Sequence, residues 1–206
     1  MKKIMNNLAS PLCFAGNKTR ILPLIHQNLP EEYDLFIDEF GGSGVVGVSQ
    51  DKNLIYNEKD KYIYNLNRTI KETDLDHILF QIEFLIETYN LSKDNKQGYL
   101  KFREDFNSLF CHCLHDRNLI IRRQSNLALL TLVFYSFNHY ITFNKEGKFT
   151  TPAGTHRSSY NKSIKNILEA PEQLIIGWSI DNDVKYSKVT LNIEEVMKYS
   201  STPENP

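Results

Sequence analysis

The sequence predicts a mixed α/β fold, and three observations carry this prediction. An apolar segment at 33–37 leads into an acidic residue and a glycine-rich turn, and a second apolar segment follows at 53–56. From about residue 61 to 136, apolar residues recur at helical spacing. After residue 139 the pattern changes to short apolar segments with turn signals between them, which is typical of a β-hairpin.

The N-terminal part, residues 8–60, is expected to alternate helices and strands. A helix is predicted at Thr19–Leu29 and a strand at Tyr33–Ile37. The glycine turn then opens a predicted helix at Val45–Gln50, and the strand Asn53–Tyr56 follows. This strand–turn–helix–strand order is typical of nucleotide-type sites, because glycines let the backbone approach a ligand closely.

The middle of the chain is expected to be mostly helical, and Ser92 followed by Lys93-Asp94-Asn95 is the expected entry to one of its helices. The strongly apolar stretch Asn126–Phe137 predicts a buried helix. The residues at helical spacing before it are Ile78, Ile82, Leu85, Ile86, Tyr89, Leu100, Phe102, Phe106, Leu109 and Phe110.

The C-terminal part combines a hairpin with further helices and strands. The segment Tyr140–Pro152 predicts the hairpin, with its turn at Lys145-Glu146-Gly147-Lys148. A helix is expected from Ser158 to Ala170, ending at Pro171. The remaining predicted elements are strands at Leu174–Ile180 and Lys188–Leu191 and a helix starting at Glu194–Tyr199.

Composition indicates one globular domain, or one domain with an insertion. Of the 206 residues, 41% are apolar and 24% charged, which argues against a disordered chain. No apolar run approaches 18 residues, so neither a membrane span nor a secretory signal is expected. The 3 cysteines argue against a disulfide framework and favour a reducing cytoplasm.

Charge is distributed unevenly along the chain. The segment from Arg117 to Lys165 contains eight basic residues and one acidic residue, Glu146, which gives it a net charge of +7. Since the whole chain carries −1, the rest carries −8. A basic segment in an acidic chain favours contact with nucleic-acid phosphates, and the alternative is an ordinary solvated face.

Two acidic residues frame the glycine turn and suggest the kind of ligand. Asp38 follows the first strand, and Glu58 lies 20 residues further on, after the second. An acid at the second position can accept from two ribose hydroxyls. Asp38 would repel a pyrophosphate but suits an ammonium, which favours S-adenosylmethionine (SAM) over NAD. The alternative is a plain strand–turn–helix with no ligand.

The Cys111-His112-Cys113-Leu114-His115 segment has metal-binding residue types but not the usual spacing of a zinc site. Structural zinc is normally held by four ligands from two separated pairs. Here the residues lie together in a helical stretch and no second pair occurs elsewhere. No metal site is expected, and the other histidines suggest no hydrolase triad.

Five segments in the same order resemble the motifs of the Dam-type DNA adenine methyltransferases, particularly the phage form. The resemblance covers about residues 10 to 200 and implies a restriction-modification or phage setting. The segments are Phe14-Ala15-Gly16-Asn17-Lys18 with Leu22-Pro23, Asp38-Glu39-Phe40-Gly41-Gly42-Ser43-Gly44, Asn57-Glu58, 144–154, and Asn192-Ile193-Glu194-Glu195-Val196-Met197.

The resemblance implies a Rossmann-like SAM-dependent methyltransferase fold with an incomplete sheet. Residues 1–70 and 160–206 would form the SAM-binding domain, interrupted by a helical and hairpin DNA-recognition insertion at 71–160. The implied cofactor-binding residues are Phe14, Gly16, Lys18, Asp38, Phe40, Gly41, Gly42, Gly44, Glu58, Asn192 and Ile193.

The implied partner is double-stranded DNA, with the hairpin entering the major groove. Tyr140 or Phe143 would wedge into the base stack and help to extrude the target adenine. Thr142 stands where the phage-type family carries an arginine that reads guanine, so a different recognition sequence is expected. The implied DNA-binding residues are Arg122, Arg123, Tyr140, Phe143, Lys145, Lys148 and Arg157.

One departure from the family leaves three interpretations open. The family's catalytic Asp-Pro-Pro-Tyr motif, expected after residue 197, does not occur in the sequence. The chain is therefore expected to be a site-specific, Dam-like DNA adenine-N6 methyltransferase truncated before this motif, or the SAM- and DNA-contacting part of one that a separate chain completes. The alternatives are an inactive pseudo-methyltransferase that binds DNA or a partner chain, and a degraded fragment.

Overall fold

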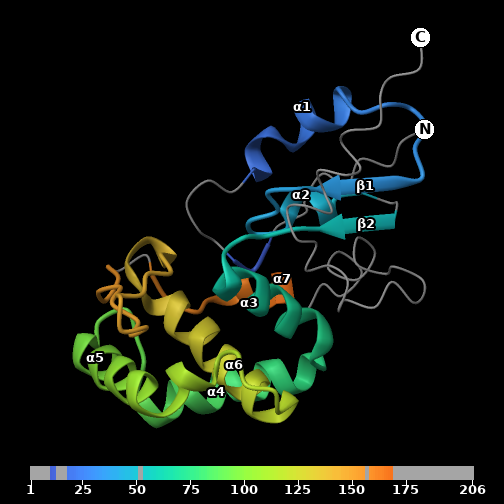
Figure 1. Ribbon diagram of the computed structural model, residues 1–206. Coiled ribbons are helices and arrows are strands. Elements are labelled where there is room, and N and C mark those ends of the chain that lie inside the picture. The colour runs from blue at the N-terminus through green and yellow to red at the C-terminus, as the bar shows by residue number, and fades with distance from the viewer. Residues whose placement is uncertain (1–9, 13–17, 51–52, 156–157, 169–206) are drawn as a thin grey trace.

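The computed structural model describes residues 10–12, 18–50, 53–155 and 158–168. Figure 1 shows a small α/β part at the N-terminal side and a larger helical part below it. The α/β part contains the 3₁₀ turn η1 (Thr19–Ile21), α1 (Leu22–Gln27), β1 (Leu35–Asp38), α2 (Val45–Val48) and β2 (Asn53–Tyr56). The predicted α/β class is confirmed, and the elements of this part begin and end within a few residues of the prediction.

The strands β1 and β2 are parallel and pair in register from Leu35 opposite Asn53 to Asp38 opposite Tyr56. Parallel strands point their carboxyl ends to the same sheet edge, so the residues after Asp38 and after Tyr56 emerge side by side. The short helix α2 connects the two strands, and Val45 and Val48 pack with Leu22 in a small apolar cluster.

The helical part contains α3 (Lys61–Glu72), α4 (Leu75–Tyr89), α5 (Lys96–Asp105) and α6 (Leu119–Tyr135). A π-helical turn, η2 (Phe106–Phe110), and a 3₁₀ turn, η3 (Cys111–Cys113), follow α5. All residues from Ser125 to Tyr135 of α6 are buried, which confirms the predicted buried helix. Helices α3, α4 and α5 surround it, so α6 forms the centre of the main core.

Side-chain caps determine where these helices begin. Asp60, Asp74 and Asn118 each accept hydrogen bonds from two backbone N–H groups in the first turn of α3, α4 and α6. The predicted helix entry at Ser92 to Asn95 is confirmed, and its cap is Asn95, which accepts from the Gly98 N–H at 3.0 Å. Ser92 instead accepts from the Asn95 N–H, one turn earlier.

The predicted hairpin is present, but isolated bridges join its arms where strands were expected. Phe143 pairs with Phe149 in an antiparallel bridge, and the Thr150 N–H donates to the Thr142 carbonyl at 2.9 Å. The turn closes through the Asn144 N–H, which donates to the Lys148 carbonyl at 2.9 Å. A second antiparallel bridge joins Ser136 to Ala153 beside the 3₁₀ turn η4 (Phe137–His139).

The described chain continues to α7 (Lys162–Leu168), which buries Ile164 and Leu168 in the main core. The predicted helix at Ser158–Ala170 is confirmed for this part. The predicted strands at Leu174–Ile180 and Lys188–Leu191 and the helix at Glu194–Tyr199 lie outside the described residues. No helix that the structure describes has both the length and the apolar composition needed to cross a membrane.

Phe149 fixes the hairpin to the helical core, and its removal is expected to destabilise the fold. Its ring is 1% exposed and lies edge-on to Phe106 and Phe143. Phe149→Ala should lower the free energy of unfolding by about 3–5 kcal/mol, because the substitution leaves a cavity. Urea denaturation followed by helical circular dichroism measures this change. Phe84→Ala, at a 52% exposed position of α4, is the control and should change stability by no more than about 0.5 kcal/mol; equal losses would contradict the burial argument.

Candidate functional site

Asp38 is buried at the carboxyl end of β1, directly before the glycine turn. Its Oδ2 accepts a hydrogen bond from the Gly47 N–H of α2 at 2.9 Å. Burial raises the pKa of the Asp38 carboxyl, the Gly47 hydrogen bond partly opposes this, and the charge of Glu58 raises it further. Among the described residues, no lysine or arginine pairs with Asp38. The site therefore holds a carboxylate that a cation would stabilise.

The glycine turn follows Asp38 and needs glycine for conformation and for space. Gly42 and Gly44 have φ of 52° and 79°, in the left-handed region where side chains are disfavoured. A Cβ at Gly41 would overlap the ring of Tyr56 at 2.1 Å. The turn is closed by the Gly44 N–H, which donates to the Gly41 carbonyl at 2.7 Å.

Two side chains donate hydrogen bonds to the carbonyl oxygen of Gly42. The Tyr56 hydroxyl donates to this oxygen at 2.6 Å, and the Asn67 amide of α3 donates to it at 3.0 Å. Asn67 also donates to the Tyr56 hydroxyl at 2.7 Å. Both side chains are buried, so the position of the glycine turn is coupled to that of α3.

Glu58 lies beside the turn, after the end of β2, and joins it to the start of α3. Its Oε2 accepts from the Gly42 N–H and its Oε1 from the Asp60 N–H, each at 2.7 Å. A carboxylate oxygen can accept two hydrogen bonds, so each oxygen retains one acceptor position. The side chain is half-buried, which leaves it able to accept from two neighbouring hydroxyls of a ligand.

The other predicted cofactor residues lie around the turn or outside the described residues. Phe40 is 86% exposed, and Lys18 is exposed at the start of η1. The Ser10 hydroxyl donates to the Ser43 carbonyl at 2.8 Å, so the segment before the Phe14–Lys18 motif lies against the turn. The predicted residues outside the description are Phe14, Gly16, Asn192 and Ile193.

The hairpin presents two exposed lysines, Lys145 and Lys148, at its turn. Phe143 is half-buried and stacks on Tyr62 of α3, with 3.7 Å between ring centroids. Tyr140 is more exposed, at 39%, and its ring contacts only the edge of Phe137 among the described aromatic residues. Of the two predicted wedge residues, Tyr140 is therefore the one with an accessible ring, because Phe143 supports the hairpin.

Side chains of α5 and η2 hold the hairpin from the other side. The Asn107 amide exchanges two hydrogen bonds with the Phe149 backbone, at 2.7 and 3.0 Å. The Tyr99 hydroxyl and the Arg103 guanidinium both donate to the Thr151 carbonyl, at 2.8 and 3.0 Å. The hairpin is thus fixed on the helical part by its backbone, while its lysines remain exposed.

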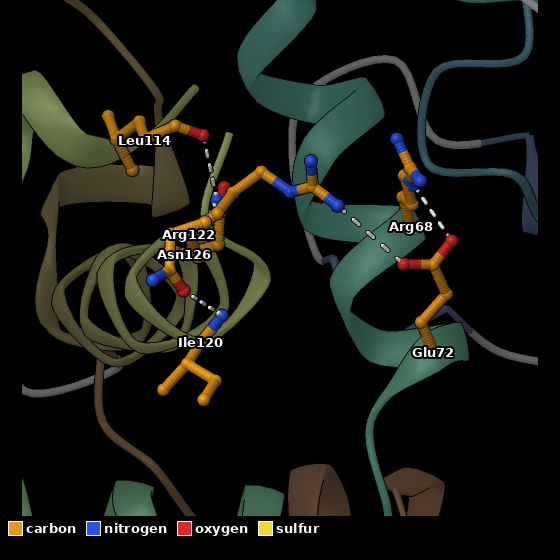
Figure 2. Close-up of polar contacts among 7 residues, drawn as sticks. Arg68, Glu72, Leu114, Ile120, Arg122 and Asn126 are labelled. Atoms are coloured by element: carbon orange, nitrogen blue, oxygen red, sulfur yellow. Dashed lines mark hydrogen bonds and ion pairs between the residues drawn. The ribbon is translucent and has the colours of Figure 1, made fainter. Parts of the chain in front are cut away.

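Arg122 and Arg123 do not lie beside the hairpin. They occupy the first turns of α6, whereas the hairpin follows the other end of this helix. Arg122 points toward Glu72 at the end of α3 (Figure 2). That both arginines contact DNA stays a prediction, and Arg157 lies outside the described residues.

A known family model matches most of the chain. The model of the D12 class of N6 adenine-specific DNA methyltransferases matches residues 14–197, which include the glycine turn, Glu58 and the hairpin. The chain belongs to this family.

Curated relatives of this D12-class chain are DNA methylases. The type II methyltransferase M.FokI of Planomicrobium okeanokoites is 30% identical over 167 residues, covering 81% of this chain and 24% of the relative. The modification methylase LlaI of Lactococcus lactis subsp. lactis is 28% identical and covers 83% of this chain and 26% of the relative. The type II methyltransferase M.MjaIII of Methanocaldococcus jannaschii is 27% identical, and the match covers 76% of this chain and 56% of the relative. The chain thus spans about a quarter to about half the length of these relatives.

Three residues of the D12-class site escaped the sequence analysis. Tyr56 and Asn67 hold the glycine turn, and Tyr62 supports the hairpin. Asn67 carried a detectable signal, since it is an amide in the buried stripe that includes Ile63, Leu66 and Ile70 of α3. Tyr56 and Tyr62 had none, because an aromatic residue at a strand end or in a first helical turn is ordinary.

Two residues of the cysteine–histidine segment make contacts with neighbouring elements. The Cys111 thiol donates to the Gly147 carbonyl of the hairpin turn at 2.7 Å. The His115 ring pairs with the Asn65 amide at 2.7 Å. No group of three metal-ligating side chains occurs in the part of the chain that the structure describes.

Asp38→Asn is expected to stabilise the ligand-free protein at neutral pH. The folded-state pKa of Asp38 is raised from 3.8, so the ionised carboxylate destabilises the fold. This cost is absent below pH 3.8 and grows as the pH rises through the folded-state pKa. The gain in unfolding free energy of the variant over wild type should therefore increase between pH 3.5 and pH 7, as measured by urea denaturation.

Asp34→Asn is the matched control, because Asp34 is exposed just before β1. A gain of the same size and pH dependence in that variant would contradict the role assigned to the burial of Asp38. So would an Asp38→Asn variant whose stability relative to wild type is constant with pH.

Proposed function

We propose that this chain binds S-adenosylmethionine and double-stranded DNA and brings the methyl donor to a target adenine. One observation carries the proposal: two carboxylates flank a glycine turn at the ends of adjacent parallel strands, and the buried one has no cationic partner within the described ranges. Family membership supports methylation at adenine N6, and the chain's own activity is part of the proposal.

The residues at the turn suit the three polar parts of SAM. Asp38 would accept from the ammonium of the methionine moiety, which supplies the missing positive charge. Glu58 would accept from the two ribose hydroxyls through its remaining acceptor positions. Lys18, exposed at the start of η1, would attract the carboxylate. SAM supplies the methyl group, and the chain's residues bind and orient it.

The exposed surfaces around the turn suit the apolar parts of the same ligand. Phe40 directly precedes Gly41, and its ring is largely exposed, so it can pack on a ligand bound at the turn. Gly42 carries no side chain and is half-buried, so a ligand can approach the backbone of the turn closely at this residue. Phe14, Gly16, Asn192 and Ile193 complete the proposed set from outside the described residues.

The hairpin would contact DNA through charge and through one aromatic ring. Lys145 and Lys148 can reach phosphates, and Tyr140 can insert beside an extruded base. The hairpin is fixed by Phe149, Asn107 and Tyr99, so it presents these groups with little loss of entropy on binding. Thr142, whose hydroxyl pairs with those of Thr150 and Thr151, supports a recognition sequence other than that of the phage-type family.

SAM binding tests the first half of the proposal. Isothermal titration of purified chain with SAM should give binding that Asp38→Asn weakens by about 10- to 100-fold, because a charge-assisted hydrogen bond is lost. Glu58→Gln should also weaken it. Glu39→Gln is the control, because Glu39 directly follows Asp38 in the glycine turn and is exposed. Absent binding, or equal affinity for Asp38→Asn and wild type, would refute the assignment.

The same variant serves as the blank for catalysis. Transfer of tritiated methyl groups from SAM to unmethylated duplex DNA by wild type, above the Asp38→Asn value, would extend the proposal from binding to methylation. Binding of SAM without transfer would limit these 206 residues to positioning cofactor and DNA.

DNA affinity should depend on salt through the hairpin lysines. Replacing Lys145 or Lys148 by glutamine removes one phosphate contact, so the slope of log K against log salt should fall by about 1 for each substitution. Lys93→Gln, on the exposed connection between α4 and α5, should leave the slope unchanged. Equal effects of all three substitutions would show that net charge matters and the hairpin does not.

A further inference from the structure

Three arginines gather where the end of α3 meets the beginning of α6, away from both the glycine turn and the hairpin. Arg68 comes from α3, and Arg122 and Arg123 come from α6. Figure 2 shows the Arg122 guanidinium between the helices, directed at Glu72, while Arg68 approaches the same carboxylate. We call Arg68, Arg122, Arg123 and Glu72 the α3–α6 arginine cluster.

Glu72 neutralises only part of this charge. Its Oε1 accepts from Arg68 Nε at 2.8 Å, whereas Arg122 Nη2 lies 3.9 Å from its Oε2, beyond hydrogen-bond distance. Arg68 and Arg122 therefore share one carboxylate, and the charge of the neighbouring Arg123 acts on Arg122 as well. Lys71, next to Glu72, adds a fourth basic group, although burial lowers its pKa to about 8.

Two nitrogens of the cluster are buried without a hydrogen-bond acceptor among the described residues. They are Arg122 Nη2 and Arg123 Nε. Buried donors in folded proteins nearly always have partners, because an unpaired donor loses its hydrogen bonds to water and gains no bond to the protein, which lowers the free energy of unfolding. Burial and the neighbouring charge of Arg68 also lower the pKa of Arg122. Both observations point to an anion that is not part of the described chain.

We propose that the α3–α6 arginine cluster binds a phosphate group. A phosphate offers several acceptor oxygens and matches the donor geometry of guanidinium groups, so one group can satisfy both arginines of α6. The side chain of Arg122 retains 14% exposure, which leaves an edge of the cluster accessible from solvent. Binding would turn the Arg122 guanidinium from Glu72 toward the phosphate, with Glu72 still paired to Arg68.

The phosphate has two sources of the same chemistry, the DNA backbone or a free phosphate compound. Phe143 of the hairpin stacks on Tyr62 of α3, and Arg68 follows six residues later on that helix, about 9 Å along its axis at about 1.5 Å per residue. A duplex that extends past the hairpin along α3 would therefore reach the cluster. The DNA source rests on the proposed function and would add a contact with flanking sequence. Binding of a free phosphate compound does not depend on the proposed function.

Titration of the purified chain with inorganic phosphate at low ionic strength tests the site directly. Arg122→Gln should weaken phosphate binding about tenfold. Glu72→Gln should strengthen it severalfold, because it removes the competing charge while its amide oxygen can still accept from Arg68. Arg117→Gln is the matched control, since Arg117 is exposed just before α6 and the substitution changes the net charge equally.

Opposite effects of Arg122→Gln and Glu72→Gln are the decisive result, because loss of folding would move both affinities in the same direction. Thermal unfolding of each variant checks the fold independently. No phosphate binding by wild type, or equal effects of Arg122→Gln and Arg117→Gln, would overturn the proposal.

Binding to DNA duplexes of two lengths identifies the source. If DNA supplies the phosphate, Arg122→Gln lowers the salt slope by about 1 on a long duplex and leaves it unchanged on one that covers only the hairpin. An unchanged slope on both, with phosphate binding still weakened, assigns the site to a free phosphate compound. SAM binding requires no DNA or phosphate, so failure of this proposal is distinguishable from failure of the proposed function.

Discussion

The parallel pairing of β1 with β2 determines where every polar group of the candidate cofactor site lies. Because Asp38 pairs with Tyr56, the two chains leave the sheet at the same edge and place Asp38 and Glu58 on either side of one turn. A slip of one residue in this register would reverse the side on which Asp38 points. The Asn57 N–H donates to the Asp38 carbonyl, and the Gly41 N–H to the Asn57 carbonyl, each at 2.9 Å, so the pairing extends into the turn itself.

Helix α3 contacts both the candidate cofactor site and the hairpin. Its N-cap Asp60 binds Glu58 through its backbone, its Asn67 holds Gly42, and its Tyr62 stacks on Phe143. The same helix ends at Glu72 in the α3–α6 arginine cluster. The proposed cofactor, hairpin and phosphate sites therefore share one rigid element, although they lie far apart in sequence.

The sequence predicted local structure well where one strong pattern acted alone. The glycine turn, both strands and the buried part of α6 follow from residue type and spacing, and the structure confirms them. The entry to α5 was predicted as the segment Ser92 to Asn95, and the structure assigns the cap to Asn95. Ser92 and Asn95 are both good caps, and the choice between them depends on packing. Arg122 and Arg123 were placed near the hairpin because they are close to it in sequence, but the length of α6 separates them from it.

The contacts that position the site were less predictable, because they depend on long-range packing. Asn67 was visible as a polar residue in an apolar stripe, yet nothing local tells which carbonyl it bonds. The stacking of Tyr62 on Phe143 joins residues about eighty positions apart. Such pairs depend on how α3, α6 and the hairpin pack together, which a single sequence does not specify.

The two proposed sites share one physical property, since each contains charge that the described protein leaves incompletely compensated. Asp38 is a buried carboxylate without a cation, and Arg122 and Arg123 are cations with too few acceptors. Sequence selected for stability alone would remove such groups, since unpaired buried charge lowers the free energy of unfolding. Their presence at the edges of one rigid helical frame argues that the missing counter-charges come from ligands, a cation at the glycine turn and an anion between α3 and α6. Ligand binding would then stabilise the fold as well as serve the reaction, because each ligand binds the folded chain and not the unfolded one.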